Sequence, residues 1–378
     1  MKIRVEVNSL ATTRVSGIGY YTQRLTEAIA NEKDTDVSAF SFNFLNRQPI
    51  PKLSERIHQE KNTLFPLRVY AKLQSYGFAF PFDLFLKKVD LTISPNYAGW
   101  PTIKSHLKAT AIHDLTYIHY PELVEKNNLP HLTRVVAQSI KTSDFIITIS
   151  EAVKQEIVDN FTIDPAKIIV TPIPPNEAFF KKNSNEVHKK YGIPTKKYIF
   201  FISTVEPRKN LPLLIEAYSR LSPELQNEYS LIISGGMGWK SEKSTEAMKD
   251  AQAKGLNVVH TGYIDEADKS ALYQKASLHV LPSFYEGFGM SVLESAASET
   301  PIVATDIPVL REVGGNGAEY FTSNDSDSLV ASITKVLKNP DYQKELVKNA
   351  SAHLATVSWK KNAELIINKV NELKNSRR

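Results

Sequence analysis

The stretch Leu281-Pro-Ser-Phe-Tyr-Glu286-Gly-Phe-Gly-Met-Ser-Val-Leu-Glu294 brings together more candidate ligand-binding groups than any other segment of this chain. It begins where an apolar, strand-like run ends, and it finishes inside a pattern typical of a helix. Gly287 and Gly289 lie between the two and would let the backbone approach a ligand closely, while amides at a helix start can face an anion. The stretch therefore predicts a phosphate-binding loop between a strand and a helix.

Two carboxylates belong to the same stretch. Glu286 lies in the loop and Glu294 about one turn into the expected helix, so we expect both near one cleft. Carboxylates beside a phosphate site suit the hydroxyls of a sugar or a ribose. The alternative is a plain strand-to-helix turn with two solvated glutamates, against which the neighbouring aromatic residues and the helix start argue. Their spacing is too short to indicate the acid/base pair of a glycosidase.

The pattern Pro-Ser-x-x-Glu-Gly-Phe-Gly-x-x-x-x-Glu, with seven residues between Glu286 and Glu294, resembles the signature of the retaining GT-B glycosyltransferases of family GT4. The resemblance implies an α/β fold of two Rossmann-like domains, whose parallel sheets face an interdomain cleft. It also implies that Glu294 binds ribose hydroxyls. The sugar hydroxyls and phosphates are then met by Glu286 and by the amides of Gly287, Phe288 and Gly289.

Length and composition are those of a globular protein with room for two domains. The chain has 378 residues, of which 42% are hydrophobic and 23% charged. The absence of Cys excludes disulfides, thiolate metal sites and cysteine nucleophiles. The start of the chain carries charges inside its apolar run, unlike a signal peptide, and no apolar run is long enough to span a bilayer. We therefore expect a cytoplasmic protein.

The positive charge of the chain is concentrated in one region. Residues 45–110 hold ten Lys and Arg against four Asp and Glu, which gives +6 where the whole chain has +5. Aromatic residues are frequent there, so this region could contact an anionic membrane at its inner face or meet a lipid-phosphate acceptor. The alternative is a solvated basic face above buried aromatic side chains. We expect no nucleic-acid partner, because no binding motif accompanies the charge.

Alternating strand and helix patterns predict two parallel α/β domains, residues 1–175 and 176–357, with a last helix in 358–378 that in GT-B proteins often packs on the first domain. In the first domain we expect strands at 3–7, 37–44, 91–94, 109–115, 145–150 and 168–171, and helices at 20–30, 67–76, 132–141 and 151–160. In the second we expect strands at 198–204, 229–234, 258–264, 278–281, 302–304 and 319–321, helices at 211–221, 241–254 and 265–276, the helix after Gly289, and two terminal helical segments. The proline-rich and polar residues 172–185 predict a linker and hinge.

Two candidate segments lie in the first domain. The segment Gly17-Ile18-Gly19 follows the first strand, as in a Rossmann unit, but Thr22 stands where the dinucleotide fingerprint has a third glycine, which argues against NAD. The resemblance implies that this glycine turn lies against the donor's pyrophosphate. The second segment, His113-Asp114, follows a strand, where ligands bind in open α/β sheets. The resemblance places His113 near the donor sugar and acceptor, positioning hydroxyls; a turn cap is the alternative.

The loop after the first strand of the second domain, Ser203 to Asn210, offers cations. A departing nucleoside diphosphate builds negative charge on its oxygens, and fixed Arg208 and Lys209 side chains would stabilise that charge. The family commonly has an Arg five residues before the Lys, and here that position holds Thr204. Either Arg208 replaces it from another angle or the phosphates are held more weakly, and an exposed basic turn is the remaining alternative.

Two further places complete the set of candidates. The resemblance implies that backbone groups near Tyr263 and Ile264 hold the nucleobase and that Leu272 packs nearby, although a plain strand-to-helix turn would look the same. No Asp-x-Asp metal site is evident. Asp325 and Asp327 have that spacing but stand before an expected helix, where capping is the better explanation.

The sequence thus predicts a retaining glycosyltransferase that moves a hexose from a nucleotide diphosphate sugar to a hydroxyl of a glycan or lipid-linked acceptor, without a metal or other cofactor. The loop sequence Glu-Pro-Arg-Lys-Asn at 206–210 is similar to that of bacterial mannosyltransferases of surface polysaccharide synthesis, which makes GDP-mannose the first donor to consider. Two alternatives stay open. A nucleotide-sugar epimerase would share the twin domains, and a non-catalytic sugar-nucleotide sensor would bind without chemistry.

Overall fold

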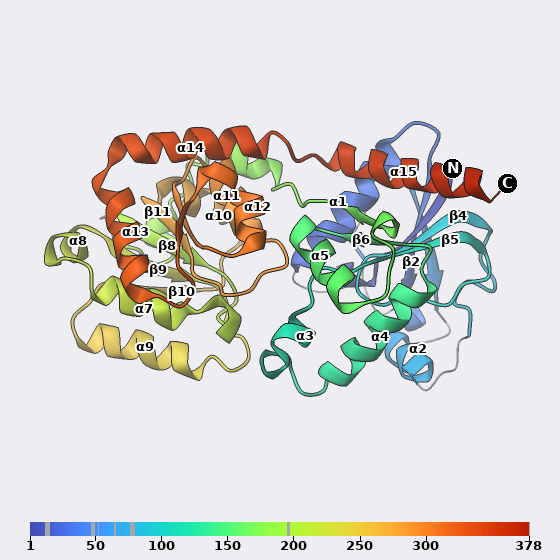
Figure 1. Ribbon diagram of the computed structural model, residues 1–378, viewed down its shortest axis with the longest axis horizontal. Coiled ribbons are helices and arrows are strands. Elements are labelled where there is room, and N and C mark those ends of the chain that lie inside the picture. Colours follow the sequence, from blue (N-terminus) through green and yellow to red (C-terminus); the bar gives the residue numbers. More distant parts are fainter. Residues whose placement is uncertain are drawn as a thin grey trace. The chain divides into compact units, whose positions relative to one another are not determined.

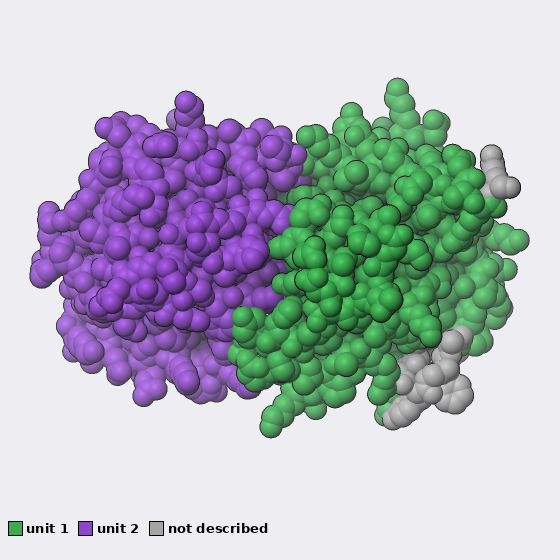
Figure 2. Space-filling view, viewed as in Figure 1, with its two compact units in different colours: residues 1–173, 358–378 green, residues 174–357 purple. Residues whose placement is uncertain are grey.

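The computed structural model describes residues 1–11, 16–46, 50–51, 53–63, 66–75, 80–194 and 197–377. The chain divides into two compact units (Figure 2). Unit 1 comprises residues 1–173 together with 358–378, and unit 2 comprises residues 174–357. Each unit has its own sheet and its own hydrophobic core. Within the described residues, no helix is both long and apolar enough to cross a membrane.

Unit 1 is built on a parallel sheet. Its described residues form seven strands in the spatial order β3-β2-β1-β4-β5-β6-β7, and every pairing between them is parallel. The order in which successive strands are added reverses between β1 and β4, which are neighbours in space but not in sequence. The strands are β1 (Lys2–Glu6), β2 (Asp36–Phe42), β3 (Ile57–Asn62), β4 (Val89–Ser94), β5 (Ser105–Ala111), β6 (Phe145–Thr148) and β7 (Ile168–Val170).

Helices cover this sheet because their apolar stripes are buried against it. In α1, for example, Tyr21, Leu25 and Ile29 recur at helical spacing and are fully buried. Helix α15, from the end of the chain, runs beside α1 in Figure 1, and its Asn362 amide donates to the Pro172 carbonyl at 2.6 Å. The helices of unit 1 are α1 (Gly17–Asn31), α2 (Leu67–Ser75), α3 (Thr116–His119), α4 (Leu129–Thr142), α5 (Glu151–Asn160) and α15 (Trp359–Ser376).

The first helix begins earlier than its apolar pattern predicts. The sequence suggested a glycine turn followed by a helix from Tyr20, but α1 starts at Gly17 and includes both glycines. The reason is a cap, since the Ser16 hydroxyl accepts from the Gly19 amide at 3.1 Å and satisfies one of the amides that a helix start leaves open. The residues before it, 12–15, lie outside the described residues.

Unit 2 repeats the architecture with a smaller sheet. Its described residues form six parallel strands in the order β10-β9-β8-β11-β12-β13. The order in which successive strands are added reverses between β8 and β11. Strands β8, β9, β11 and β12 are buried along almost their whole length, as expected for a sheet covered on both faces. They are β8 (Tyr198–Ile202), β9 (Ser230–Ser234), β10 (Val258–Gly262), β11 (Leu278–Leu281), β12 (Ile302–Thr305) and β13 (Glu319–Phe321).

The core of unit 2 joins these strands to α7 and α13, with Leu214, Tyr218, Ile333 and Val336 fully buried. Residues 172–185, predicted as a linker, contain the unit boundary, and Asn183 and Asn185 are tied to α10 by side-chain hydrogen bonds. The helices of unit 2 are α6 (Val187–Lys190), α7 (Leu211–Ser219), α8 (Pro223–Glu228), α9 (Glu242–Ala253), α10 (Glu266–Lys275), α11 (Met290–Ala297), α12 (Pro308–Gly314), α13 (Ser326–Lys338) and α14 (Pro340–Leu354).

The sequence patterns missed several elements. Strand β3 was not predicted, because it is an edge strand in which Ile57 is buried while its other residues are exposed or half-buried. The two terminal helical segments expected in the second domain are α13 and α14, and the expected last helix is α15. The break between the first two is at Asn339-Pro340, where the Asn339 side chain accepts from the Tyr342 amide and Pro340 opens α14. The short helices α3, α6, α8 and α12 were also not predicted.

Candidate active site

The candidate residues of unit 2 gather where its strand order reverses. The loop after β8 carries Arg208 and Lys209, and the loop after β11 carries Glu286. These two strands are neighbours at the centre of the sheet, and the Phe284 amide donates to the Arg208 carbonyl at 3.2 Å, which joins the loops directly. Ligands of open α/β sheets bind outside the carboxyl ends of the strands at such a reversal.

Four charged side chains form the core of this place, and we call Glu206, Arg208, Lys209 and Glu286 the Arg208 cluster. Arg208 Nη1 donates to Glu286 Oε2 at 2.6 Å and to the Tyr285 carbonyl at 3.0 Å. Lys209 Nζ donates to the other oxygen, Glu286 Oε1, at 2.5 Å. Glu286 is therefore held from two sides by the two cations that the sequence singled out.

The electrostatics of the cluster keep Glu286 charged. Burial by itself would raise the pKa of Glu286, but the charges of Arg208 and Lys209 outweigh it and lower the pKa to about 2. Burial and the charge of Arg208 lower the pKa of Lys209, against the opposing attraction of Glu286. At neutral pH Glu286 is a carboxylate that accepts hydrogen bonds, and it does not act as an acid.

The glycine-rich loop of the central stretch leads directly into α11. Gly289 has a φ of +87°, which L side chains rarely adopt, and a Cβ placed on it would lie 2.6 Å from Leu310 Cδ2. Helix α11 begins with the next residue, Met290. Phe288 is buried. This loop therefore has the backbone geometry that the sequence predicts, and the open amides of the α11 start can face an anion.

Glu294 has partners other than those of Glu286. Its Oε2 accepts from the Tyr273 hydroxyl at 3.0 Å, and the charge of Lys269 acts on it, both from α10. Burial raises the pKa of Glu294, while Lys269 and Tyr273 oppose the shift. The two carboxylates of the stretch thus have different partners. Glu286 contacts the loop after β8, and Glu294 contacts α10.

The residues proposed for the nucleobase differ in exposure. Tyr263, after β10, is 47% exposed, whereas Ile264 and Leu272 are buried. The Leu272 carbonyl accepts from the Tyr198 hydroxyl at 2.6 Å, so this residue is part of the packing between α10 and β8. Ser203, in the loop after β8, donates its amide to the Ser234 carbonyl at 3.0 Å and so ties this loop to the end of β9.

In unit 1 the candidate residues gather around His113, and we call Tyr21, Pro95, Tyr97 and His113 the His113 cluster. His113 Nε2 lies 2.7 Å from the Pro95 carbonyl, and because a carbonyl can only accept, Nε2 carries the proton. The rings of Tyr21 and Tyr97 meet the imidazole edge-on. Burial lowers the pKa of His113 despite the opposing Pro95 carbonyl, so the ring is neutral and Nδ1 remains an acceptor.

The neighbours of His113 are placed by local contacts. Asp114 Oδ1 accepts from the Thr116 amide at 3.1 Å, a turn-capping contact. Tyr21 comes from α1, which also contains Gly17, Ile18 and Gly19, and the Ile18 carbonyl accepts from the Thr22 hydroxyl at 2.8 Å. The structure therefore brings His113 next to the helix of the glycine pair, and both glycines belong to its first turn.

The interpretation of Asp325 as a helix cap is confirmed. Its Oδ1 accepts from the Ser328 amide at 3.0 Å at the start of α13, while Asp327 pairs with Arg220. Among the residues that the structure describes, no group of three or more His, Cys, Asp or Glu side chains could hold a metal ion.

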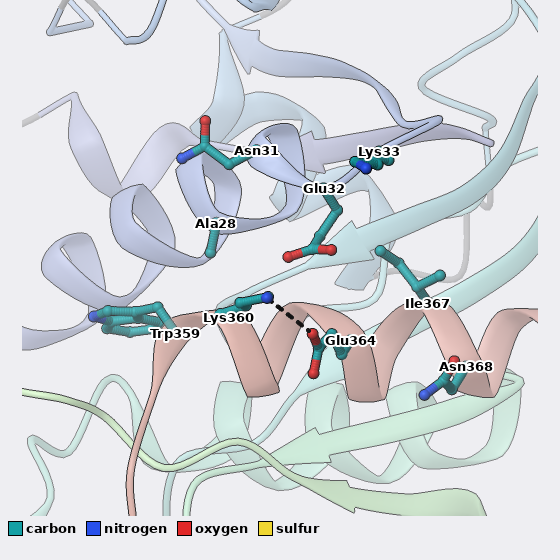
Figure 3. A pocket seen from close by; sticks show the side chains of 9 residues that line it. All are labelled: Ala28, Asn31, Glu32, Lys33, Trp359, Lys360, Glu364, Ile367 and Asn368. Atoms are coloured by element: carbon teal, nitrogen blue, oxygen red, sulfur yellow. Dashed lines mark ion pairs between the residues drawn. The ribbon is translucent and has the colours of Figure 1, made fainter. Parts of the chain in front are cut away.

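A groove of about 740 Å³ lies elsewhere in unit 1 (Figure 3). It runs between the end of α1 and α15, and Lys360 and Glu364 pair along its wall at 3.7 Å. None of the predicted site residues lines it. Its lining residues are Ala28, Asn31, Glu32, Lys33, Trp359, Lys360, Glu364, Ile367 and Asn368.

Sequence reasoning missed three residues of the unit 2 site. Glu206 is buried and binds Arg208, and Tyr273 and Lys269 accompany Glu294. A signal existed for Glu206, which stands two residues before Arg208 in the same strand-end loop. Lys269 and Tyr273 lie in α10, whose periodic pattern gives no hint of a buried carboxylate partner.

Comparisons with known proteins identify similar glycosyltransferases. Residues 183–353 match the family Glycosyl transferases group 1. The chain is 26% identical over 319 residues to O-antigen chain mannosyltransferase B of Escherichia coli, covering 84% of this chain and 78% of that protein. It is 29% identical over 233 residues to the serotype-specific mannosyltransferase WbdA of Escherichia coli, covering 60% of this chain but only 28% of the length of WbdA.

Solved structures show the fold. The glycosyltransferase WaaG, involved in lipopolysaccharide biosynthesis, superposes with a TM-score of 0.71 at 13% identity and covers 98% of this chain and 99% of its own. Anabaena Alr3699/HepE in complex with UDP and glucose gives a TM-score of 0.70 at 16% identity, over 98% of this chain and all of that one. Residues 183–353 therefore match the family Glycosyl transferases group 1, in a chain whose two Rossmann-like units have the GT-B fold.

Proposed function

We propose that this chain is a retaining glycosyltransferase that transfers a hexose, with mannose from GDP-mannose as the first candidate, to a hydroxyl of a glycan or lipid-linked acceptor. The observation that carries the proposal is the Arg208 cluster, in which a buried carboxylate and two cations meet at the strand reversal of unit 2. The mannosyltransferase relatives support the choice of sugar.

The cluster suits the chemistry of a departing nucleoside diphosphate. Arg208 and Lys209 are balanced by Glu206 and Glu286 at neutral pH, so the positive field available to a diphosphate also needs the amides of the glycine loop and the α11 start. Glu286, ionised at neutral pH, would accept hydrogen bonds from sugar hydroxyls. Glu294 would accept from the ribose. Each carboxylate would thus bind a different part of the same nucleotide sugar, in keeping with their different neighbours.

In the proposed reaction the bond between the sugar C1 and the phosphate oxygen breaks, and a bond from C1 to the acceptor oxygen forms on the same face. The acceptor proton passes to the leaving phosphate oxygen. Charge builds on the phosphate as the bond breaks, and Arg208, Lys209 and the loop amides would stabilise it. His113 would accept from a hydroxyl through Nδ1, because its Nε2 proton is engaged by Pro95. No step requires a metal.

The donor can be tested by thermal unfolding. We expect GDP-mannose to raise the melting temperature more than UDP-glucose or dTDP-glucose, because a ligand that binds only the folded state stabilises it. Incubation with labelled GDP-mannose and membrane extracts should then give a labelled product whose anomeric configuration, measured by NMR, is that of the donor. Formation of a new free nucleotide sugar without acceptor would favour an epimerase, and donor binding without any product would favour a sensor.

We also propose that unit 1 contacts an anionic membrane surface through a patch formed by Val69, Leu73, Phe85 and Ile103. In α2, Tyr70 is buried against Phe42, while Val69 and Leu73 face outward and are 48% and 42% exposed. Phe85 is 85% and Ile103 is 57% exposed.

Hydrogen bonds hold these segments next to one another. Buried Asp83 accepts from the amides of Ile103 and Lys104 at 3.0 and 2.9 Å, so the loop of Phe85 is fixed to the loop of Ile103. The hydroxyl of Tyr70 donates to the Phe80 carbonyl, which ties α2 to the same region. Lys87 and Lys88 are exposed beside it and would supply the charge that anionic headgroups attract.

Vesicle flotation tests this patch. The chain should float with vesicles that contain phosphatidylglycerol and remain unbound to pure phosphatidylcholine, and Phe85→Ser with Ile103→Ser should abolish flotation. Phe180→Ser, which removes an aromatic side chain in unit 2 that is 57% exposed, as Ile103 is, serves as the control and should float like the wild type. Equal flotation of the patch variant and the control would contradict the proposal.

A further inference from the structure

We propose that Glu206, to which the sequence pattern gives no role, is a positioning residue that holds the Arg208 guanidinium in the orientation in which it meets the donor diphosphate. The inference rests on the proposed function, because it assumes that a nucleoside diphosphate binds at the Arg208 cluster. It adds to that function a residue that touches no substrate and acts through Arg208.

The geometry of Arg208 carries the inference. Nε and Nη2 both donate to Glu206 Oε1, at 3.2 and 2.8 Å, on one edge of the guanidinium. On the other side Nη1 donates to Glu286 and to the Tyr285 carbonyl. A long arginine side chain has many rotamers, and fixing it before the ligand arrives removes an entropic cost from binding. Glu206 thus supplies one of the two sides of a clamp.

Glu206 is itself held rigidly. The Val205 amide donates to the Gly236 carbonyl and the Gly238 amide donates to the Val205 carbonyl, both at 2.9 Å. These two hydrogen bonds fix the residue before Glu206 to the loop after β9. Gly235 permits this approach, because a Cβ on it would lie 1.8 Å from the Ser203 carbonyl oxygen. The Glu206 side chain is 4% exposed. A buried carboxylate fixed in this way can orient its partner.

The charge of Glu206 reaches Lys209 as well. Burial and the charge of Arg208 lower the pKa of Lys209, whereas the charges of Glu286 and Glu206 raise it. Loss of the Glu206 charge would lower the pKa of Lys209 further. A change confined to the packing of the loop would leave this titration unchanged, so the pH dependence of ligand binding shows whether the charge of Glu206 acts within the cluster.

A double-mutant cycle with GDP as the probe tests the inference by calorimetry on the full chain. If Glu206 acts through Arg208, Glu206→Ala and Arg208→Ala should each weaken GDP binding on the order of tenfold, and the double variant should be no weaker than Arg208→Ala alone. Glu216→Ala removes an exposed glutamate that pairs with Arg220 in the same unit, and should bind GDP like the wild type.

Glu206→Gln keeps the shape of the side chain. It provides a second test of the inference if circular dichroism shows that the alanine variant is not folded. It should weaken GDP binding and shift the alkaline limb of its pH profile to lower pH. Additive losses in the double variant, or an unchanged pH profile in Glu206→Gln, would overturn the inference and leave the proposed function standing. Failure of the wild-type chain to bind GDP, UDP or pyrophosphate would overturn both.

Discussion

The His113 cluster of unit 1 and the Arg208 cluster of unit 2 occupy equivalent places in two similar sheets, and their chemistry is opposite. Both lie at carboxyl strand ends beside the reversal of strand order. The first consists of rings and a carbonyl with a neutral imidazole. The second consists of four charged side chains.

This difference shows that the fold supplies the position and the side chains supply the ligand preference. A neutral imidazole among aromatic rings suits hydroxyls, whereas paired cations beside a helix start suit a diphosphate. We therefore expect substitutions in the Arg208 cluster to change donor binding and turnover together, and substitutions in the His113 cluster to change turnover with donor affinity retained.

The largest effect is expected at Lys209 and Glu286. Lys209→Ala removes a cation that would stabilise the departing diphosphate, and Glu286→Ala leaves two cations without their shared carboxylate. We expect turnover of GDP-mannose to fall on the order of a hundredfold or more in each variant, by analogy with the removal of an oxyanion stabiliser. Steady-state kinetics with calorimetric GDP binding measures this. If both turnover and binding were untouched, the unit 2 assignment would be wrong.

The acid stability of unit 2 should depend on Glu286. Its folded pKa of about 2 lies below the ordinary value of 4.5, so its contribution is present above about pH 4.5 and is lost as the pH falls towards 2. The difference in unfolding free energy between the wild type and Glu286→Gln, from urea titrations at pH 6, 4 and 2.5, should therefore shrink as the pH falls. A constant difference would show that the charge of Glu286 is not what the two cations stabilise.

How far the sequence predicts the fold depends on burial. Strands such as β6 are continuous apolar runs, and α5 begins at Glu151 as expected, directly after Ser150, whose hydroxyl accepts from the Val153 amide. Strand β3 has no such run, because it is an edge strand that buries mainly Ile57. A run of apolar residues, which marks a buried strand in the sequence, is absent from β3, so this strand could not be predicted.

The site was predictable as a set of residues but not as a set of contacts. Arg208, Lys209 and Glu286 follow neighbouring strands, and this position singles them out. Their ion pairs join residues 77 and 78 positions apart, and no local pattern encodes such a pairing. Glu206 was missed for the same reason, since an acidic residue beside a basic one in a loop is usually solvated.

A smaller effect is expected at His113. His113→Ala removes the hydroxyl acceptor and leaves the Pro95 carbonyl without its donor, and we expect turnover to fall about tenfold while GDP affinity is retained. Nitrogen NMR of the wild-type ring should show a proton on Nε2 and a pKa below 6.5. A His113→Ala variant that lost GDP affinity as strongly as Lys209→Ala would remove the contrast between the two clusters.

The smallest effects are expected for alanine substitutions of two glycines, which should change the unfolding free energy in opposite directions. Gly289 has a positive φ, and a Cβ there would also press on Leu310, so Gly289→Ala should cost about 1 kcal/mol or more of unfolding free energy. Gly17 lies in the first turn of α1, where alanine is favoured, so Gly17→Ala should stabilise the chain by about 0.5 kcal/mol. Urea unfolding gives both values.

GDP binding by the Gly17→Ala variant then decides what this glycine does. If affinity falls although the fold is more stable, the missing Cβ is needed for approach of the diphosphate, as the resemblance to family GT4 implies. If affinity is unchanged, the glycine pair is a feature of the helix start alone, and unit 2 holds the diphosphate without it.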